Sequence, residues 1–233
     1  MLRLSTCFCD NRAVPPRRRY HHGNLKQLLL DSAVALIAEA GPRAFTLREL
    51  ARRARVSHNA PYRHFKDRED LLAAVAAQGF DLLTTAMTDE MAGGRTSLER
   101  LDLAGRGYVK FALNWPQHIL VMFETPARDP LRPEYEASGR RAFQTLLDAI
   151  VGVQAEGGLP AGDPHPYAIV AWSAVHGLAK LAIAGRLPFD AAETVAFTRY
   201  MTLSLSQGMA NLPHPGQPGS TPAVRGALRD NRS

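Results

Sequence analysis

The 233-residue sequence predicts an all-α protein with about nine helices. Apolar residues recur at three- and four-residue spacing along most of the chain, which is the period of a helix that buries one face. Helix-start signals precede several of these stripes, including Thr46 with Glu49 and Thr96 with Glu99. No stretch shows the alternation of apolar and polar residues that is typical of a half-buried strand. A small N-terminal helical unit followed by a larger helical bundle is therefore expected.

The first helix is predicted over residues 25–40, with Asn24 as its N-cap. Leucine, isoleucine and alanine side chains form its buried stripe, and Gly41 followed by Pro42 ends it. The preceding residues, 1–19, show no periodicity and end in a Pro- and Arg-rich run. We expect them to form a disordered basic arm whose role would be attraction to phosphates.

Two short helices joined by a tight turn should follow the first helix. One is capped by Thr46 and buries an apolar face that ends near Ala54. The other is predicted over residues 58–65, with Ser57 as its N-cap. Pro61 lies within this second helix, close enough to its start that a rigid first turn is expected rather than a break.

Six further helices are expected in the larger bundle. Asp67 caps the first of them, and its length allows mechanical coupling between the small basic unit and the bundle. We predict these helices from Asp67 to Gly93 and over 97–114, 118–123, 135–156, 167–184 and 191–210. The chain accordingly divides into an arm (1–19), a helix-turn-helix domain (20–70), a helical domain (71–211) and a disordered tail (212–233).

The excess positive charge of the chain lies entirely in its first part. Residues 1–70 contain 14 Lys and Arg against 7 Asp and Glu, which gives +7. The other 163 residues contain 14 against 15, which gives −1. Because phosphates need cations close by, this distribution favours nucleic acid as the partner of the N-terminal unit. A basic, solubilising chain end is the alternative explanation.

The sequence gives no sign of export, and the cytoplasm is the expected location. Cys7 and Cys9 are the only cysteines, and their spacing suits neither an ordinary disulfide nor a zinc site. The first ten residues lack the apolar run of a signal peptide. The most hydrophobic segment, 167–184, contains His176 and Lys180, so a buried helix is favoured over a membrane span.

The second short helix carries the side chains that suggest a function. His58, Asn59, Arg63 and His64 are expected to face solvent, while the preceding helix supports them from below. A short helix with so many hydrogen-bonding groups suits insertion into a DNA major groove. The alternative is a helical hairpin on the surface without a specific partner.

The residues from Thr46 to Leu72 resemble the DNA-binding domain of TetR-type transcriptional regulators. The resemblance extends over residues 20–78, because Tyr62, His64, Phe65 and Lys66 follow in the family's order. A second segment, WSAVHG from Trp172 to Gly177, resembles a TetR C-terminal domain subtype named for its Trp, His and Gly residues.

This resemblance implies a homodimer that holds two DNA-binding domains over a palindromic operator. The helices near 167–184 and 191–210 would form the dimer bundle, and a small molecule bound among the C-terminal helices would change the separation of the two domains. Most such proteins are repressors that are released from the operator by their ligand.

The resemblance also implies roles for individual residues. His58, Asn59, Ala60 and Arg63 would face bases or line the groove, whereas Tyr62 and His64 would grip the phosphate backbone. Arg63 is chemically suited to guanine, Asn59 to adenine and the Ala60 methyl group to thymine. Arg55 departs from the family, which commonly has glycine in this turn, at a position that favours a left-handed backbone. The full DNA-binding set is Thr46, Leu47, Arg48, Ser57, His58, Asn59, Ala60, Tyr62, Arg63, His64, Lys66 and Arg68.

Aromatic and polar side chains concentrate in the middle helices. A cavity lined by them would suit an apolar or aromatic effector with one hydrogen-bonding group, although aromatic residues at helical spacing more often form core. The predicted effector set is Tyr108, Phe111, Trp115, Phe123, Phe143, Trp172 and His176. The apolar residues predicted for the dimer interface are Val175, Leu178, Phe197, Tyr200, Met201 and Leu205.

Two other function classes compete with a regulator. An enzyme is disfavoured because the sequence contains no nucleophile elbow, phosphate-binding loop, zinc-protease motif or dinucleotide fingerprint. No catalytic residue, cofactor or metal site is predicted. An architectural DNA-binding protein is the other alternative, which would need no cavity and would show little sequence preference.

Overall fold

The computed structural model describes residues 25–124 and 133–211, and this part of the chain consists of helices joined by turns and loops, with no strand. The N-terminal unit comprises α1 (Leu25–Ala40), α2 (Leu47–Ala54) and the 3-10 helix η1 (Pro61–Arg63). The bundle comprises α3 (Arg68–Met91), α4 (Ser97–Asn114), α5 (Pro116–Glu124), α6 (Pro133–Ala155), α7 (His165–Ile183) and α8 (Ala191–Ala210). The all-α prediction is confirmed, with eight α-helices in the described ranges instead of about nine.

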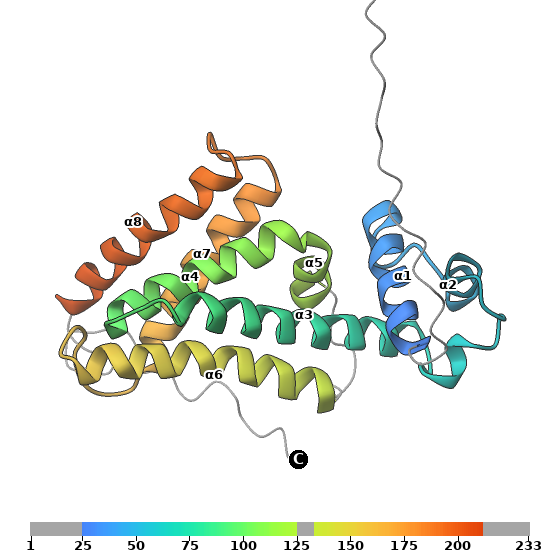
Figure 1. The fold of residues 1–233 in the computed structure, drawn as a ribbon, viewed down its shortest axis with the longest axis horizontal. Coiled ribbons are helices and arrows are strands. Elements are labelled where there is room, and N and C mark those ends of the chain that lie inside the picture. Colours follow the sequence, from blue (N-terminus) through green and yellow to red (C-terminus); the bar gives the residue numbers. More distant parts are fainter. Residues whose placement is uncertain (1–24, 125–132, 212–233) are drawn as a thin grey trace, which may run out of the picture.

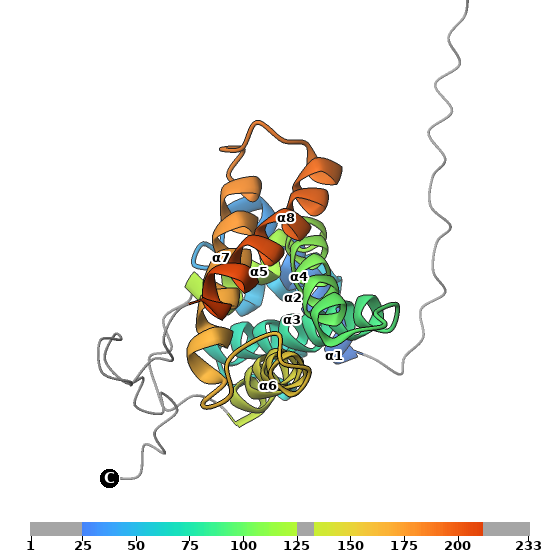
Figure 2. The ribbon, with the colours of Figure 1, turned by 90° about the vertical axis from the view of Figure 1, so that its left-hand side faces the viewer.

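The small unit and the bundle are joined by α3. Figure 1 shows α1 and α2 together at one side of the molecule, with α3 running from them across the bundle. Each of the other bundle helices packs against α3, α4 or both, and the view along the long axis in Figure 2 shows α6 on one side and α7 and α8 on another. Because α3 has 24 residues, it spans about 36 Å at 1.5 Å per residue.

The predicted helix starts at α2, α3, α4 and α8 are confirmed by their hydrogen bonds. Thr46 and Glu49 form a complete capping box, as do Thr96 with Glu99 and Asp190 with Glu193. The Asp67 side chain accepts from the Asp70 N–H at 2.7 Å. These four starts rest on contacts within four residues of chain, which explains why sequence alone located them.

The second short helix was predicted wrongly, since residues 58–65 form turns and a single 3-10 turn rather than an α-helix. Pro61 has no N–H to donate to the Ser57 carbonyl, and this carbonyl instead accepts from Ala60 at 2.9 Å. The Arg63 N–H then donates to the Ala60 carbonyl, and the N–H groups of His64 and Phe65 both donate to the Pro61 carbonyl. Ser57 does not cap this element, whose first flanking residue is Ala60 without a side-chain cap. We call residues 57–66 the recognition segment.

Arg55 adopts the left-handed conformation expected for the turn after α2. Its φ of 55° makes it the single non-glycine residue with positive φ in the described part of the chain. Its N–H satisfies carbonyls at the end of α2, so the turn works as a helix C-cap although it lacks glycine. The side chain of Arg55 is exposed, and the strained backbone costs about 1 kcal/mol.

A continuous core connects the small unit to the bundle. One cluster of buried apolar side chains runs from Leu29 of α1 through Leu71 and Val75 of α3 to Val109 of α4. At the junction, α5 packs against both α1 and α3. His118 of α5 is buried there, with Nε2 3.4 Å from Gln78 Oε1, and its burial lowers its pKa. Because of these contacts, a displacement of α3 or α5 should also move α1.

Two helices, α3 and α7, are long and apolar enough to cross a membrane by length and composition alone. Both take part in the packing of the bundle, where α3 contacts α4, α5 and α6. The most hydrophobic window of α7 is 33% buried, so this helix is only partly covered, in contrast to the expectation of a buried helix over 167–184. Val170 and Leu181 are among the exposed residues of α7.

Several expectations lie outside the described residues. These are the arm of residues 1–19 with Cys7 and Cys9, the N-cap Asn24 and the tail over residues 212–233.

Candidate DNA-binding surface and effector cavity

The recognition segment projects most of its polar side chains into solvent. His58, Asn59, Arg63 and His64 are exposed, and Tyr62 is 50% exposed. Ala60, Pro61 and Phe65 anchor the segment by pointing into the protein, where each is less than a tenth exposed. This arrangement follows from the sequence, because the three apolar residues pack the segment against α2. Its polar side chains remain in solvent.

The predicted DNA-binding residues separate into outward and inward groups. Leu47 and Ala60 are only 5% and 7% exposed. In this arrangement the Ala60 methyl group is buried and cannot contact a thymine. Arg68 is engaged, since its guanidinium donates to the Arg43 carbonyl at 2.9 Å and pairs with Glu69. The structure exposes the side chains of Thr46, Arg48, Ser57, His58, Asn59, Tyr62, Arg63, His64 and Lys66.

The exposed cations of this surface are mostly available for an anionic partner. Arg53 is the exception, because it donates to Glu39 at 2.6 Å, which raises the pKa of Arg53 and lowers that of Glu39. Arg48, Arg52 and Arg63 form no ion pair with any other described residue, and all three are exposed. The surface can thus neutralise several phosphates without first breaking internal ion pairs.

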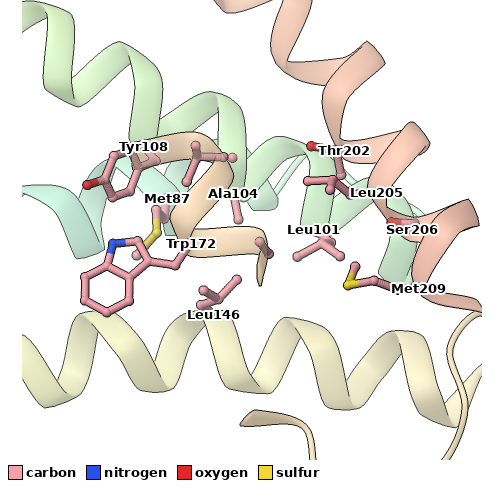
Figure 3. Close-up of a pocket in the computed structure, with 13 residues that line it drawn as sticks. Met87, Leu101, Ala104, Tyr108, Leu146, Trp172, Thr202, Leu205, Ser206 and Met209 are labelled. Atoms are coloured by element: carbon pink, nitrogen blue, oxygen red, sulfur yellow. The ribbon is translucent and has the colours of Figure 1, made fainter. Parts of the chain in front are cut away.

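A cavity of about 40 Å³ lies inside the bundle, with walls from α3, α4, α6, α7 and α8. Figure 3 shows Tyr108 and Trp172 together in this wall, with Thr202, Leu205, Ser206 and Met209 of α8 farther along it. The wall is mainly apolar, and its lining residues are Met87, Leu101, Ala104, Gly105, Tyr108, Leu146, Ala171, Trp172, Val175, Thr202, Leu205, Ser206 and Met209.

The Tyr108 end of the cavity contains a satisfied polar network. The Tyr108 hydroxyl lies 2.7 Å from His176 Nδ1, and Trp172 lines the cavity beside it. Burial raises the pKa of Tyr108 well above its ordinary value, so the hydroxyl is protonated at neutral pH. Phe123 packs edge-on against His176 with ring centroids 4.6 Å apart, and Phe143 packs against Trp172 at 5.8 Å.

The structure brings five of the seven predicted effector residues together. Tyr108 and Trp172 line the cavity, while Phe123, Phe143 and His176 form the aromatic cluster behind them. Phe111 is 2% exposed in the core and Trp115 is 45% exposed at the end of α4, and neither lines the cavity.

Sequence reasoning missed the contribution of α8 to the cavity. Thr202, Leu205, Ser206 and Met209 all line it, although none was assigned to an effector site. The sequence did contain a signal, because Thr and Ser recur at every fourth position from Thr194 to Ser206. All four of these residues are buried in the structure.

Two of the six apolar residues predicted for a dimer interface are buried within the protomer, three are half-buried and Tyr200 is exposed. Val175 and Leu178 are 9% and 7% exposed, and Val175 lines the cavity. The prediction treated these helices as apolar nearly all round, but the buried face turns toward α4. The large apolar residues left exposed on α7 and α8 are Val170, Leu181, Ile183 and Tyr200.

Two family models match this chain. Residues 29–75 match the model described as bacterial regulatory proteins, tetR family. Residues 101–204 match the model described as tetracyclin repressor-like, C-terminal domain. The first match contains α2 and the recognition segment, and the second contains most of the cavity wall.

Two curated relatives from Mycobacterium tuberculosis are similar to this chain in sequence. The HTH-type transcriptional repressor Rv3405c is 34% identical over 79 residues, which are 34% of this chain and 38% of that protein. This match thus spans about two fifths of the relative's length. The uncharacterized HTH-type transcriptional regulator Rv0681 is 25% identical over 196 residues, covering 84% of this chain and 86% of that protein.

Solved structures have the same fold. A protein of unknown function from Rhodococcus sp. RHA1 superposes with a TM-score of 0.72 at 31% identity, covering 83% of this chain and all of that one. FadR from Bacillus subtilis, in complex with stearoyl-CoA, gives 0.68 at 17% identity, with 78% and 98% covered. AibR, in complex with isovaleryl coenzyme A and operator DNA, gives 0.61 at 19% identity, with 75% and 96% covered. The last two likenesses show the fold alone.

Proposed function

We propose, for a chain that belongs to the TetR family of transcriptional regulators, that it is a repressor released from a palindromic operator by a small molecule. It is a DNA-binding regulator rather than an enzyme, and the recognition segment with the start of α2 would contact the operator. The observation that carries the proposal is the continuous core that links this exposed, cationic surface through α3 to a cavity in the bundle.

The proposed site in DNA requires two copies of the chain. The exposed apolar residues of α7 and α8 support a homodimer through these helices, with Tyr200 68% exposed and Leu181 48% exposed. Covering such side chains favours association, at about 25 cal/mol per Å² of buried apolar surface. A twofold dimer presents two recognition segments, and its operator should therefore be a palindrome.

The effector is proposed to be apolar or aromatic with one hydrogen-bonding group. Each lining residue of the cavity is neutral, and most are apolar. The volume of about 40 Å³ is far below the roughly 300 Å³ of a small ligand site, so binding must open the bundle. FadR and AibR were solved in complex with CoA thioesters, whose acyl groups are likewise apolar.

The C-terminal domain subtype, the domain boundaries and the cellular location are part of the same proposal. Trp172, His176 and Gly177 support the Trp-His-Gly subtype, since His176 bonds to Tyr108 and Trp172 lines the cavity beside it. The helix-turn-helix domain is proposed over 20–70 and the effector and dimerisation domain over 71–211, a boundary that falls in the first turn of α3. We place the protein in the cytoplasm, where its DNA partner would be.

Gel shifts with DNA from upstream of its own gene test the proposal. We expect the protein to bind that fragment in preference to a scrambled fragment of the same length and composition, because exposed side chains of the recognition segment read base edges. The affinity should fall about a thousandfold between 50 and 200 mM salt if six phosphates are contacted. Equal affinity for the scrambled fragment would instead assign an architectural role.

A further inference from the structure

Helix α8 buries a row of hydroxyl side chains at four-residue spacing. Thr194, Thr198, Thr202 and Ser206 are 1%, 0%, 8% and 6% exposed, on the face that packs against α4. Gly105 of α4 permits this packing, because a Cβ at that position would lie 3.2 Å from Thr198 Cγ2. Alanine or valine would fill these positions without bringing polar atoms into the core, so each hydroxyl needs an explanation.

The first two hydroxyls are satisfied by their own helix. Thr194 Oγ1 donates to the Asp190 carbonyl at 2.7 Å, and Thr198 Oγ1 donates to the Thr194 carbonyl at 3.3 Å. Ser206 differs, since its Oγ is buried and has no hydrogen-bond partner among the described residues. A buried hydroxyl without a partner destabilises the protein that contains it.

Ser206 lies in the wall of the cavity, so a molecule bound in the cavity can supply the missing hydrogen-bond partner. The Tyr108 hydroxyl at the other end is already engaged, because it lies 2.7 Å from His176 Nδ1. Between these ends the wall contains Thr202 and apolar side chains such as Leu101 and Leu205.

We infer that Ser206 is the hydrogen-bonding anchor of the effector site. The ligand would be an uncharged molecule with a compact apolar body and one hydroxyl or carbonyl group, with that group against Ser206 and the body toward Trp172. A charged group would lose its hydration against this apolar wall without a counter-charge. Met87 and Met209 also line the cavity, and their unbranched side chains can repack to admit the ligand. The inference rests on the proposed effector cavity and adds the ligand class and its orientation.

Tryptophan fluorescence offers a direct test, because the chain has two tryptophans and Trp172 lines the cavity. Trp115→Phe removes the other signal in the full-length protein. The probes are benzyl alcohol and ethylbenzene, which have the same shape and differ by a hydroxyl in place of a methyl group. Titrations without DNA should show that Ser206→Ala weakens benzyl alcohol binding about tenfold. Ethylbenzene binding should change less than twofold, since it makes no such bond.

Stability supplies the second measurement, with Ser204→Ala as the matched control on the exposed face of α8. Ser206→Ala should raise the urea midpoint of the ligand-free protein above that of Ser204→Ala, because it removes an unpartnered buried hydroxyl. A serine with only a structural role would lower the midpoint instead. An equal loss for both probes, or binding of neither probe by the Trp115→Phe protein, would overturn the inference. Gel shifts with the upstream fragment test DNA recognition independently of these outcomes.

Discussion

Replacing Gly107 by alanine should lower the free energy of unfolding by about 3 kcal/mol. The added Cβ would lie 2.4 Å from the Ala86 carbonyl oxygen and 2.8 Å from the Met87 Cα. Both contacts are to the backbone of α3, so relief requires α4 to move away from the central helix. Urea denaturation followed by circular dichroism measures the loss.

Gly208→Ala is the matched control for this prediction. Gly208 lies in α8 with no atom within 4 Å of its would-be Cβ, so alanine should stabilise the helix by up to about 1 kcal/mol. If both variants changed stability by the same amount, the close approach of α3 and α4 would be wrong. A shift of α4 would also displace Tyr108 from the cavity, and ligand binding should suffer with stability.

Replacing Arg63 by alanine should weaken operator binding by about 1–3 kcal/mol for each recognition segment. Two segments in a dimer double this effect, which corresponds to a loss of at least about thirtyfold. Arg63 is exposed and forms no ion pair with another described residue, so the folded state should keep its stability. Fluorescence anisotropy on the operator, with thermal melts in parallel, measures both quantities.

Operator variants identify what Arg63 contacts. If it reads a base, the Arg63→Ala protein should no longer discriminate at one symmetric base-pair position while retaining its preferences elsewhere. Arg53→Ala is a suitable control, because Arg53 is already paired with Glu39. A uniform loss across all operator variants would assign Arg63 to a phosphate, and no loss at all would remove it from the interface.

The elements that sequence predicted well depend on local chemistry. Thr96 and Glu99 are three residues apart, and a capping box needs nothing more distant. The predicted starts of α5, α6 and α7 were each two residues late, and each of these helices has a proline in its first turn, namely Pro116, Pro133 and Pro166. Proline is compatible with the first turn of a helix, where its missing N–H is not needed.

The errors and omissions occur where the structure depends on packing between residues that lie far apart in the sequence. Pro61 was expected to leave an α-helix after it, but the Ser57 carbonyl found the Ala60 N–H and a 3-10 turn resulted. The direction in which Val175 points depends on how α7 crosses α4, which periodicity does not specify. The role of Ser206 in the cavity wall likewise requires α4 and α8 to be placed side by side.

One measurement tests the coupling between the cavity and DNA most directly. Ala171 lines the cavity, and Ala171→Leu should fill its 40 Å³ without touching the recognition segment. A compound that raises the melting temperature of the wild type but not of Ala171→Leu is added to an operator titration of both proteins. We predict about a tenfold loss of operator affinity in the wild type and none in Ala171→Leu. Release of both proteins to the same extent, or of neither, would contradict control of DNA binding through this cavity.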